Sequence, residues 1–82
     1  TGEAFFSLYP NPATDGVLIQ FNGEIPLSGI KAEITNLNGH IIKKAILHPD
    51  DLRIPTTDLK PGIYIVSIVL NEKVFSRKLI IR

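Results

Sequence analysis

Short apolar runs broken by turn-forming residues make up most of this chain. In Ile30–Thr35 apolar and polar residues alternate strictly, which is typical of a strand with one face in a core and the other in solvent. Val17–Phe21 also alternates, and it is rich in β-branched and aromatic residues. No long stretch has a clean helical period, so the pattern predicts strands throughout. The predicted strands are Phe5–Tyr9, Val17–Phe21, Ile30–Asn36, His40–Leu47, a brief one around Arg53 and Ile54, Ile63–Leu70 and Lys73–Arg82.

Turn residues between these runs predict how the strands connect. The Asn-Gly pair that ends at Gly39 suits a type I turn followed by a left-handed glycine, which joins the flanking strands into a hairpin. Pro61-Gly62 suits a type II turn, and residues 71–72 form a tight turn between the last two strands. The spacing predicts an all-β fold, an immunoglobulin-like antiparallel β-sandwich of about seven short strands. The length allows one small domain, residues 1–82.

The last two predicted strands are apolar on both faces, which a half-exposed sheet does not require. Either the fold covers this hairpin on both sides, or the hairpin presents an apolar surface to a partner. In so small a domain the first alternative is hard to satisfy for every residue. The second alternative is therefore the hypothesis, and its candidate docking surface consists of Ile63, Ile65, Val69 and Phe75.

The charge of the chain is unevenly spread. The formal net charge is +1, but residues 73–82 contain four basic residues and no acidic one, a charge of +4. Residues 1–72 contain five basic and eight acidic residues, a charge of −3. Such asymmetry often marks interaction tails, but cations also keep exposed edge strands from pairing, and charge alone favours this second interpretation. The net charge is too small, and aromatic residues too few, to indicate a nucleic-acid partner.

The chain offers no recognisable catalytic or metal-binding pattern. It has no cysteine, which excludes a disulfide, a thiolate metal site and a cysteine nucleophile. His40 and His48 lack the spacing of a zinc site, and the acidic residues at 50, 51 and 58 lack that of a calcium loop. No serine lies in a nucleophile elbow, and no glycine-rich phosphate loop is present. We therefore expect a binding or addressing domain, not an enzyme, with no cofactor, no metal and no small-molecule substrate.

Four short motifs follow one another in a distinctive order. LYPNPATDG comes first, and its prolines at 10 and 12 exclude a central strand at that point. ITNLNGHII, DLKPGIYIVSI and RKLIIR follow. Each motif alone is ordinary turn or strand chemistry. Together, from about Leu8 to Arg82, they resemble the C-terminal sorting domain of the type IX secretion system, in its type A form, found on exported proteins of the Bacteroidetes group.

This resemblance implies a function in protein export. It implies a single C-terminal domain that directs a larger cargo protein from the periplasm across the outer membrane, to the cell surface or the extracellular medium. The implied partners are the outer-membrane translocon and its shuttle proteins, the upstream cargo domain, and a sortase-like cysteine protease that then removes the domain. The cut would fall near or before Thr1.

The resemblance also assigns individual residues. Those that match the structural motifs of the family are Pro10, Asn11, Pro12, Gly39, Leu59, Gly62 and Tyr64. The family uses its closing basic and apolar strand for recognition by the export machinery, and the matching residues are Lys78, Leu79, Ile80, Ile81 and Arg82.

Two other functions compete with this interpretation. One is an immunoglobulin-like or fibronectin-like spacer in a secreted enzyme, and the other is a small adhesion module. DLKPGIY resembles the L-x-P-G-x-x-Y sequence of fibronectin type III domains, but Tyr64 comes one residue earlier here. Position separates the alternatives, because a spacer can lie inside a protein whereas a sorting domain ends its precursor.

Overall fold

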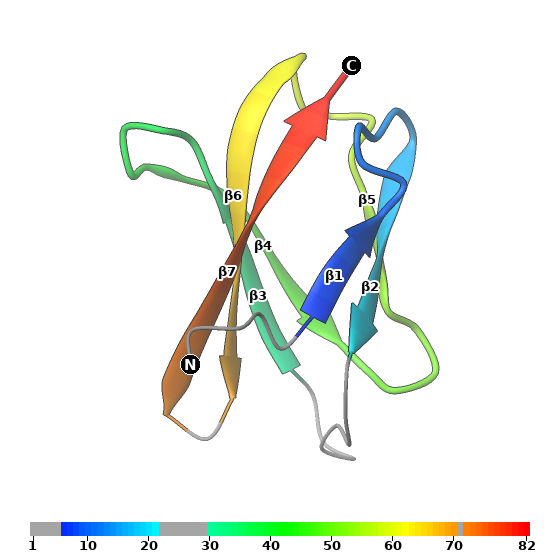
Figure 1. Ribbon diagram of the computed structural model, residues 1–82, viewed down its shortest axis with the longest axis vertical. Coiled ribbons are helices and arrows are strands. Elements are labelled where there is room, and N and C mark those ends of the chain that lie inside the picture. The colour runs from blue at the N-terminus through cyan, green and yellow to red at the C-terminus, as the bar shows by residue number, and fades with distance from the viewer. Residues whose placement is uncertain (1–5, 22–29, 71) are drawn as a thin grey trace.

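The computed structural model describes residues 6–21, 30–70 and 72–82, and these form seven β-strands (Figure 1). The strands are β1 Phe6–Tyr9, β2 Gly16–Phe21, β3 Ile30–Thr35, β4 Ile41–Leu47, β5 Arg53–Pro55, β6 Gly62–Leu70 and β7 Lys73–Ile81. Every predicted strand is present close to its predicted bounds. Two predicted residues, Phe5 at a strand start and Asn71 in a turn, lie outside the described residues. In the described part of the chain, no helix is long and apolar enough to cross a membrane.

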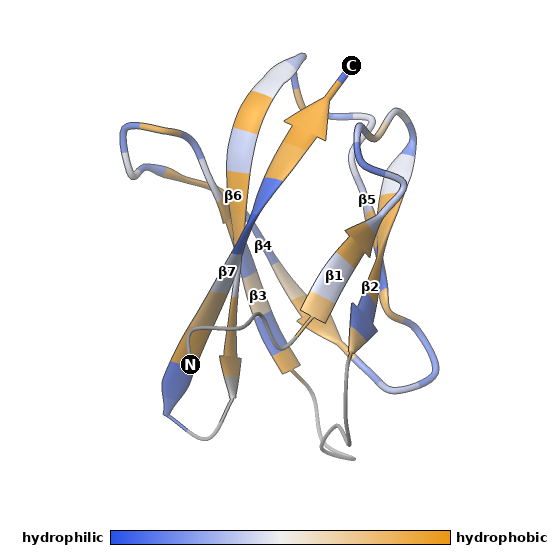
Figure 2. Ribbon diagram, viewed as in Figure 1, coloured by the Kyte–Doolittle hydropathy of each residue, from blue (hydrophilic) through white to orange (hydrophobic). Residues whose placement is uncertain are grey.

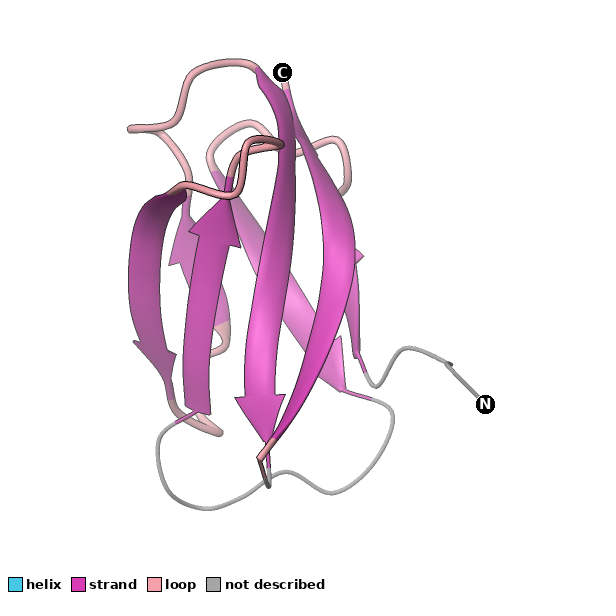
Figure 3. Cartoon of the chain, turned by 90° about the vertical axis from the view of Figure 1, so that its left-hand side faces the viewer, coloured by secondary structure: helices cyan, strands magenta, loops and turns pink. Residues whose placement is uncertain are grey.

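The strands form two sheets that pack face to face (Figures 1 and 3). One sheet has the order β1-β2-β5 and the other the order β4-β3-β6-β7, and all neighbouring strands are antiparallel. The predicted all-β sandwich is therefore confirmed. In antibody constant domains the fourth strand belongs to the first sheet, whereas β4 here extends the second. The last strand, β7, is an edge strand, and β1, the edge of the other sheet, contacts it.

The core lies between the two sheets and follows the two-residue period of the strands. In β3, Ile30, Ala32 and Ile34 are buried, and the residues between them face outward. Figure 2 shows this alternation as apolar and polar bands along the strands. The largest fully buried side chains among the described residues are Phe6, Val17, Ile19, Ile30, Ile34, Leu47, Ile54, Thr56, Val66, Ile68 and Leu79.

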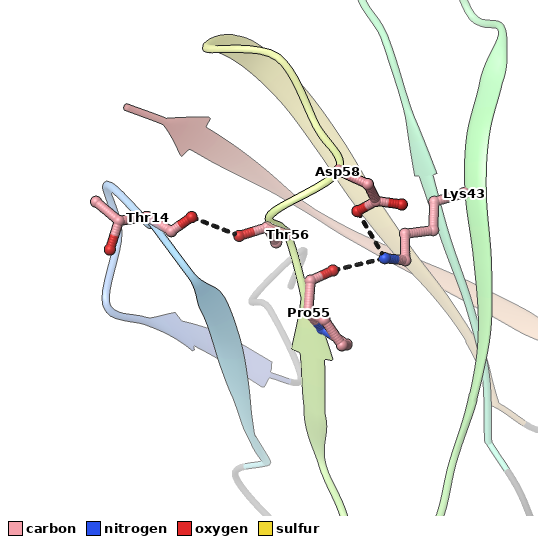
Figure 4. Close-up of polar contacts among 5 residues, drawn as sticks. All are labelled: Thr14, Lys43, Pro55, Thr56 and Asp58. Atoms are coloured by element: carbon pink, nitrogen blue, oxygen red, sulfur yellow. Dashed lines mark hydrogen bonds and ion pairs between the residues drawn. The ribbon is translucent and has the colours of Figure 1, made fainter.

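Polar contacts fasten the segment that leads into β6 (Figure 4). The buried Thr56 donates a hydrogen bond from Oγ1 to the carbonyl oxygen of Thr14 at 3.2 Å. Lys43 of β4 donates from Nζ to the carbonyl oxygen of Pro55 at 2.7 Å and to Oδ1 of Asp58 at 3.0 Å. The segment between β5 and β6 is thus bonded to both sheets, which positions the start of β6.

The turn predicted at Gly39 is confirmed. The N–H of Gly39 donates to the carbonyl oxygen of Asn36, the N–H of Asn36 donates to that of His40, both at 3.0 Å, and Gly39 has a φ of 86°. The type II turn predicted at Pro61-Gly62 is wrong, because φ of Gly62 is 158° and not about +80°. Gly62 instead begins β6, where it pairs with a residue of β7 in an extended conformation.

Candidate functional site

The hairpin of β6 and β7 has one buried and one exposed face. The sandwich buries Tyr64, Val66, Ile68, Leu79 and Ile81. On the opposite side lie Ile63, Ile65 and Val69, and the register places Ile80 beside Ile63 and Val74 beside Val69. Ile63, Val69 and Val74 expose 44%, 42% and 64% of their surface. These five residues are here called the outer face of the hairpin. Ile65 and Ile80 are half-buried, and the other three are exposed to solvent.

Phe75, predicted from the sequence to belong to the docking surface, lies on the other side of the hairpin. It pairs with the buried Ile68 and packs against the hydrophobic core. Side chains alternate along a strand, so Val74 and Ile80 share the outer face and Phe75 does not. The placement of Phe75 in the docking surface is wrong for this reason. The placement of Ile63, Ile65 and Val69 on one common face is what the structure shows.

The segment expected to be recognised, 78–82, alternates between core and solvent. Leu79 and Ile81 are buried, with 0% and 4% of their surface exposed. Lys78 and Arg82 are exposed, and Ile80 is half-buried on the outer face. In the folded domain Lys78, Ile80 and Arg82 are accessible to a partner, whereas Leu79 and Ile81 anchor β7 in the sandwich.

The side chain of Asn11 is hydrogen-bonded to the backbone of this same segment. Its Oδ1 accepts a hydrogen bond from the N–H of Ile80, and its Nδ2 donates one to the carbonyl oxygen of Lys78, both at 2.9 Å. The N–H of Ala13 donates to the carbonyl oxygen of Ile80 at 2.7 Å, and the N–H of Arg82 donates to that of Ala13 at 2.9 Å. Residues 11–13, here called the clamp, thus bond to β7 as an additional strand would.

Sequence reasoning excluded a central strand at Pro10 and Pro12 and matched Pro10, Asn11 and Pro12 to a structural motif of the family, but it did not predict this contact with β7. The peptide bonds that precede both prolines are cis. Proline has no N–H, whereas the asparagine side chain offers both a hydrogen-bond donor and an acceptor. This side chain between two prolines is the local signal of the contact. The partners of Asn11 lie 67 and 69 residues further along the chain, so nothing near Asn11 in the sequence identifies them.

The family-motif residues that precede and begin β6, Leu59, Gly62 and Tyr64, have a structural role. Leu59 is buried, and the side chain of Tyr64 enters the core while its hydroxyl donates a hydrogen bond to the carbonyl oxygen of Lys60 at 2.6 Å. A buried tyrosine bonded to the backbone a few residues upstream also occurs as the tyrosine corner of immunoglobulin-like domains. Gly62 lies between them at the start of β6. Leu59, Gly62 and Tyr64 therefore fix the entry into the hairpin.

The basic residues at 73–82 have no ion-pair partner among the described residues. The ion pair that the described residues form lies elsewhere and joins Lys43 to Asp58. The hydrogen bond from Lys43 lowers the pKa of the Asp58 carboxyl. Arg77 donates from Nε to the carbonyl oxygen of Phe6 at 3.1 Å, a neutral acceptor. The positive charge of β7 is therefore not neutralised within the described structure.

Chemistry-bearing side chains do not gather elsewhere in the described structure. In residues 6–21, 30–70 and 72–82, no group of three or more histidine, aspartate or glutamate residues is placed to hold a metal ion. His40 and His48 are both exposed. Every buried side-chain polar atom of these ranges has a hydrogen-bond partner. The candidate site therefore rests on the outer face of the hairpin, the cations of β7 and the clamp, and not on a metal or catalytic cluster of the described residues.

Comparison with known proteins identifies the family of the chain. Over 84 aligned residues the chain is 29% identical to karilysin of Tannerella forsythia, an alignment that covers 92% of this chain and 18% of karilysin. The chain thus spans less than a fifth of that relative's length. Residues 7–82 match the family described as the secretion system C-terminal sorting domain. Since this match covers nearly the whole chain, the chain belongs to that family, the sorting domains of type IX secretion, whose members direct the proteins that carry them to the cell surface or the extracellular space.

Proposed function

We propose that this chain is the export signal of a larger cargo protein, and that the translocon and its shuttle proteins recognise it through the β6–β7 hairpin. The observation that supports this most directly is the exposed apolar outer face beside the uncompensated cations of β7. A folded monomer gains nothing by leaving such a face in water, whereas a partner that covers it gains hydrophobic free energy.

The cations determine how a partner approaches the hairpin. Lys78 pairs with Ile65 in the register, so its ammonium group shares the outer face with the apolar side chains. Exposed charges steer association and orient the two surfaces, while buried apolar contacts supply most of the affinity. Recognition therefore combines Lys78 and Arg82 with Ile63, Val69 and Val74. Leu79 and Ile81 contribute by keeping β7 in place.

The remaining steps of the proposal concern the precursor. The cargo precedes this domain, and a sortase-like cysteine protease removes the domain after export, by a cut near or before Thr1. The family assignment supports the order of cargo and domain, since the family is described as a C-terminal sorting domain, and the removal step follows from the resemblance alone. The spacer and adhesion alternatives share the sandwich architecture, so the fold does not separate them from a sorting domain.

Export of a reporter tests the proposal. Residues 1–82 are fused to the C-terminus of a periplasmic reporter in a host with a type IX system, and reporter at the cell surface and in the medium is measured. Val69→Thr with Val74→Thr removes apolar groups from the outer face and should weaken recognition about tenfold, since each lost methyl group is worth about 0.8 kcal/mol.

The matched control carries Leu18→Thr and Leu37→Thr, two exposed apolar residues outside the hairpin. It should be exported like the unaltered fusion. Equal export of both double variants would contradict recognition through the outer face. A fusion with the unaltered domain that stays in the periplasm would contradict the sorting function and favour a spacer or adhesion module.

A further inference from the structure

The outer edge of β7 is only partly covered. In an antiparallel sheet, alternate residues of an edge strand direct their backbone N–H and C=O groups away from the neighbouring strand. The bonds to the clamp show that Lys78, Ile80 and Arg82 are residues whose backbone N–H and C=O groups point away from β6. By the same alternation, the backbone N–H and C=O groups of Val74 and Ser76 point away from β6 as well.

The clamp closes one part of this edge. It occupies the carbonyl of Lys78, both backbone groups of Ile80 and the N–H of Arg82. A partner strand cannot pair there while Asn11 and Ala13 remain bonded. The terminal residues of the sorting tail are thus already paired within the domain.

The upstream part of the edge is open. The backbone groups of Val74 and Ser76 and the N–H of Lys78 have no hydrogen-bond partner among the described residues. Unpaired edge groups of this kind are templates for another strand. A shallow groove between β1 and β7 adjoins this edge at Lys78, and it is lined by Ser7, Leu8, Asn11, Arg77 and Lys78.

The groove has a positive charge. Of the residues that line it, Arg77 and Lys78 are the ionisable ones, and neither has a carboxylate partner among the described residues. Lys73 adds a third cation at the start of the same strand. An extended segment paired with this edge would meet the backbone groups of β7 and the cations that the strand carries, so acidic side chains complement this edge.

We propose that an extended acidic segment of a partner protein pairs with β7 along Val74–Lys78, upstream of the clamp. This rests on the proposed function and narrows it, because it places strand pairing before the last residues of the tail and not on them. The outer face and this edge are adjacent on one hairpin, so one partner can use both.

Peptide binding to the purified chain tests the pairing. The probes are a capped peptide of alternating valine and glutamate, about six residues long, and the same peptide with lysine in place of glutamate. The glutamate peptide should shift the NMR signals and slow the hydrogen exchange of the Val74, Ser76 and Lys78 amides, and Arg77 exchange should change less. The lysine peptide should bind at least about tenfold more weakly, and added salt should weaken the binding of the glutamate peptide. Equal binding of both peptides, or shifts that map elsewhere, would overturn the inference.

A matched pair of variants isolates the backbone group. Ser76→Pro removes the outward N–H and leaves the bonds to β6 in place, a position where an edge strand tolerates proline. Ser76→Ala removes only the hydroxyl group and its contact with Ser67. Ser76→Pro should weaken binding of the glutamate peptide about tenfold, because the lost donor leaves a carbonyl group of the peptide unpaired. Ser76→Ala should leave this binding unchanged. If Ser76→Pro does not fold, Lys73→Glu with Lys78→Glu takes its place, and unchanged peptide affinity of this variant would equally overturn the inference.

Reporter export separates the two proposals. If deletion of 78–82 abolishes export and Ser76→Pro, folded, does not reduce it, the pairing edge is wrong and the sorting function stands. If the unaltered domain fails to export its reporter, the sorting function is wrong. The peptide measurement still decides whether an acidic segment pairs with the edge of β7. Reduced export of Ser76→Pro with normal export of Ser76→Ala supports both.

Discussion

The amide of Asn11 completes the edge of β7 by accepting a hydrogen bond from the N–H of Ile80 at 2.9 Å. The two residues are 69 positions apart, at opposite ends of the described chain. This contact joins the first of the four motifs to the last one in the folded chain. The asparagine between two prolines holds the strand that carries the cations.

Replacement of Asn11 should loosen the end of β7 without disrupting the sandwich. Asn11→Ala removes two hydrogen bonds at an exposed site and should lower the free energy of unfolding by about 1–2 kcal/mol. Hydrogen exchange at the amides of Ile80 and Arg82 should accelerate. Asn38→Ala, an exposed asparagine whose side chain makes no hydrogen bond within the described structure, is the control and should change neither quantity. Unchanged exchange at Ile80 in Asn11→Ala would contradict the clamp.

The hydroxyl of Tyr64 should contribute measurably to stability. Tyr64→Phe leaves the ring in the core but removes the bond to the carbonyl oxygen of Lys60, so we expect a loss of about 1–2 kcal/mol. Urea unfolding measures it as a lower midpoint with an unchanged slope. Tyr9→Phe removes the same hydroxyl from a residue that is 64% exposed and should have little effect. Equal midpoints for the two variants would rule out this role of Tyr64.

Substitutions at the adjacent residues Leu79 and Ile80 should affect different properties, stability in the first case and export in the second. Leu79→Ala deletes a fully buried side chain and should destabilise the domain by about 2–5 kcal/mol. Ile80→Thr changes the outer face, so it should lower stability far less while it reduces reporter export. Thermal unfolding and export are measured on both variants. An Ile80→Thr domain that is stable and fully exported would show that the outer face is not recognised at this position.

The Lys43–Asp58 ion pair should make stability depend on pH in the acidic range. The hydrogen bond from Lys43 lowers the pKa of Asp58, so the folded state is favoured by the charged carboxylate above its usual pKa, about 4. This contribution disappears as the pH falls through the lowered pKa. Because Asp58 is exposed, the effect should be small.

Asp58→Asn tests the pH dependence directly. The difference in unfolding free energy between the unaltered chain and the variant should be present at neutral pH and vanish in strong acid. Asp50→Asn, an exposed aspartate without an ion pair in the described structure, serves as the control. A constant difference between the unaltered chain and Asp58→Asn from neutral pH to strong acid would argue against this contribution.

Local pattern alone was sufficient for the strands and one of the turns. Ile30–Thr35 alternates because a strand in a two-layer sandwich has one face in the core, and Gly39 is a glycine because the turn needs a positive φ. The order of the four motifs was sufficient to indicate the family. The Pro61-Gly62 turn was misjudged because the same residue pair also permits an extended start to a strand.

The sequence by itself determined the seven strands, the excess of apolar residues in the last hairpin and the positive charge of its final strand. Only the tertiary structure decided which face of that hairpin is exposed, that Phe75 faces the core, and that Leu79 and Ile81 anchor the tail. It alone also placed Asn11 on β7. The physical reason is that alternation is a local property of the backbone, whereas burial and edge pairing depend on how two sheets pack and which distant segment lies beside each edge.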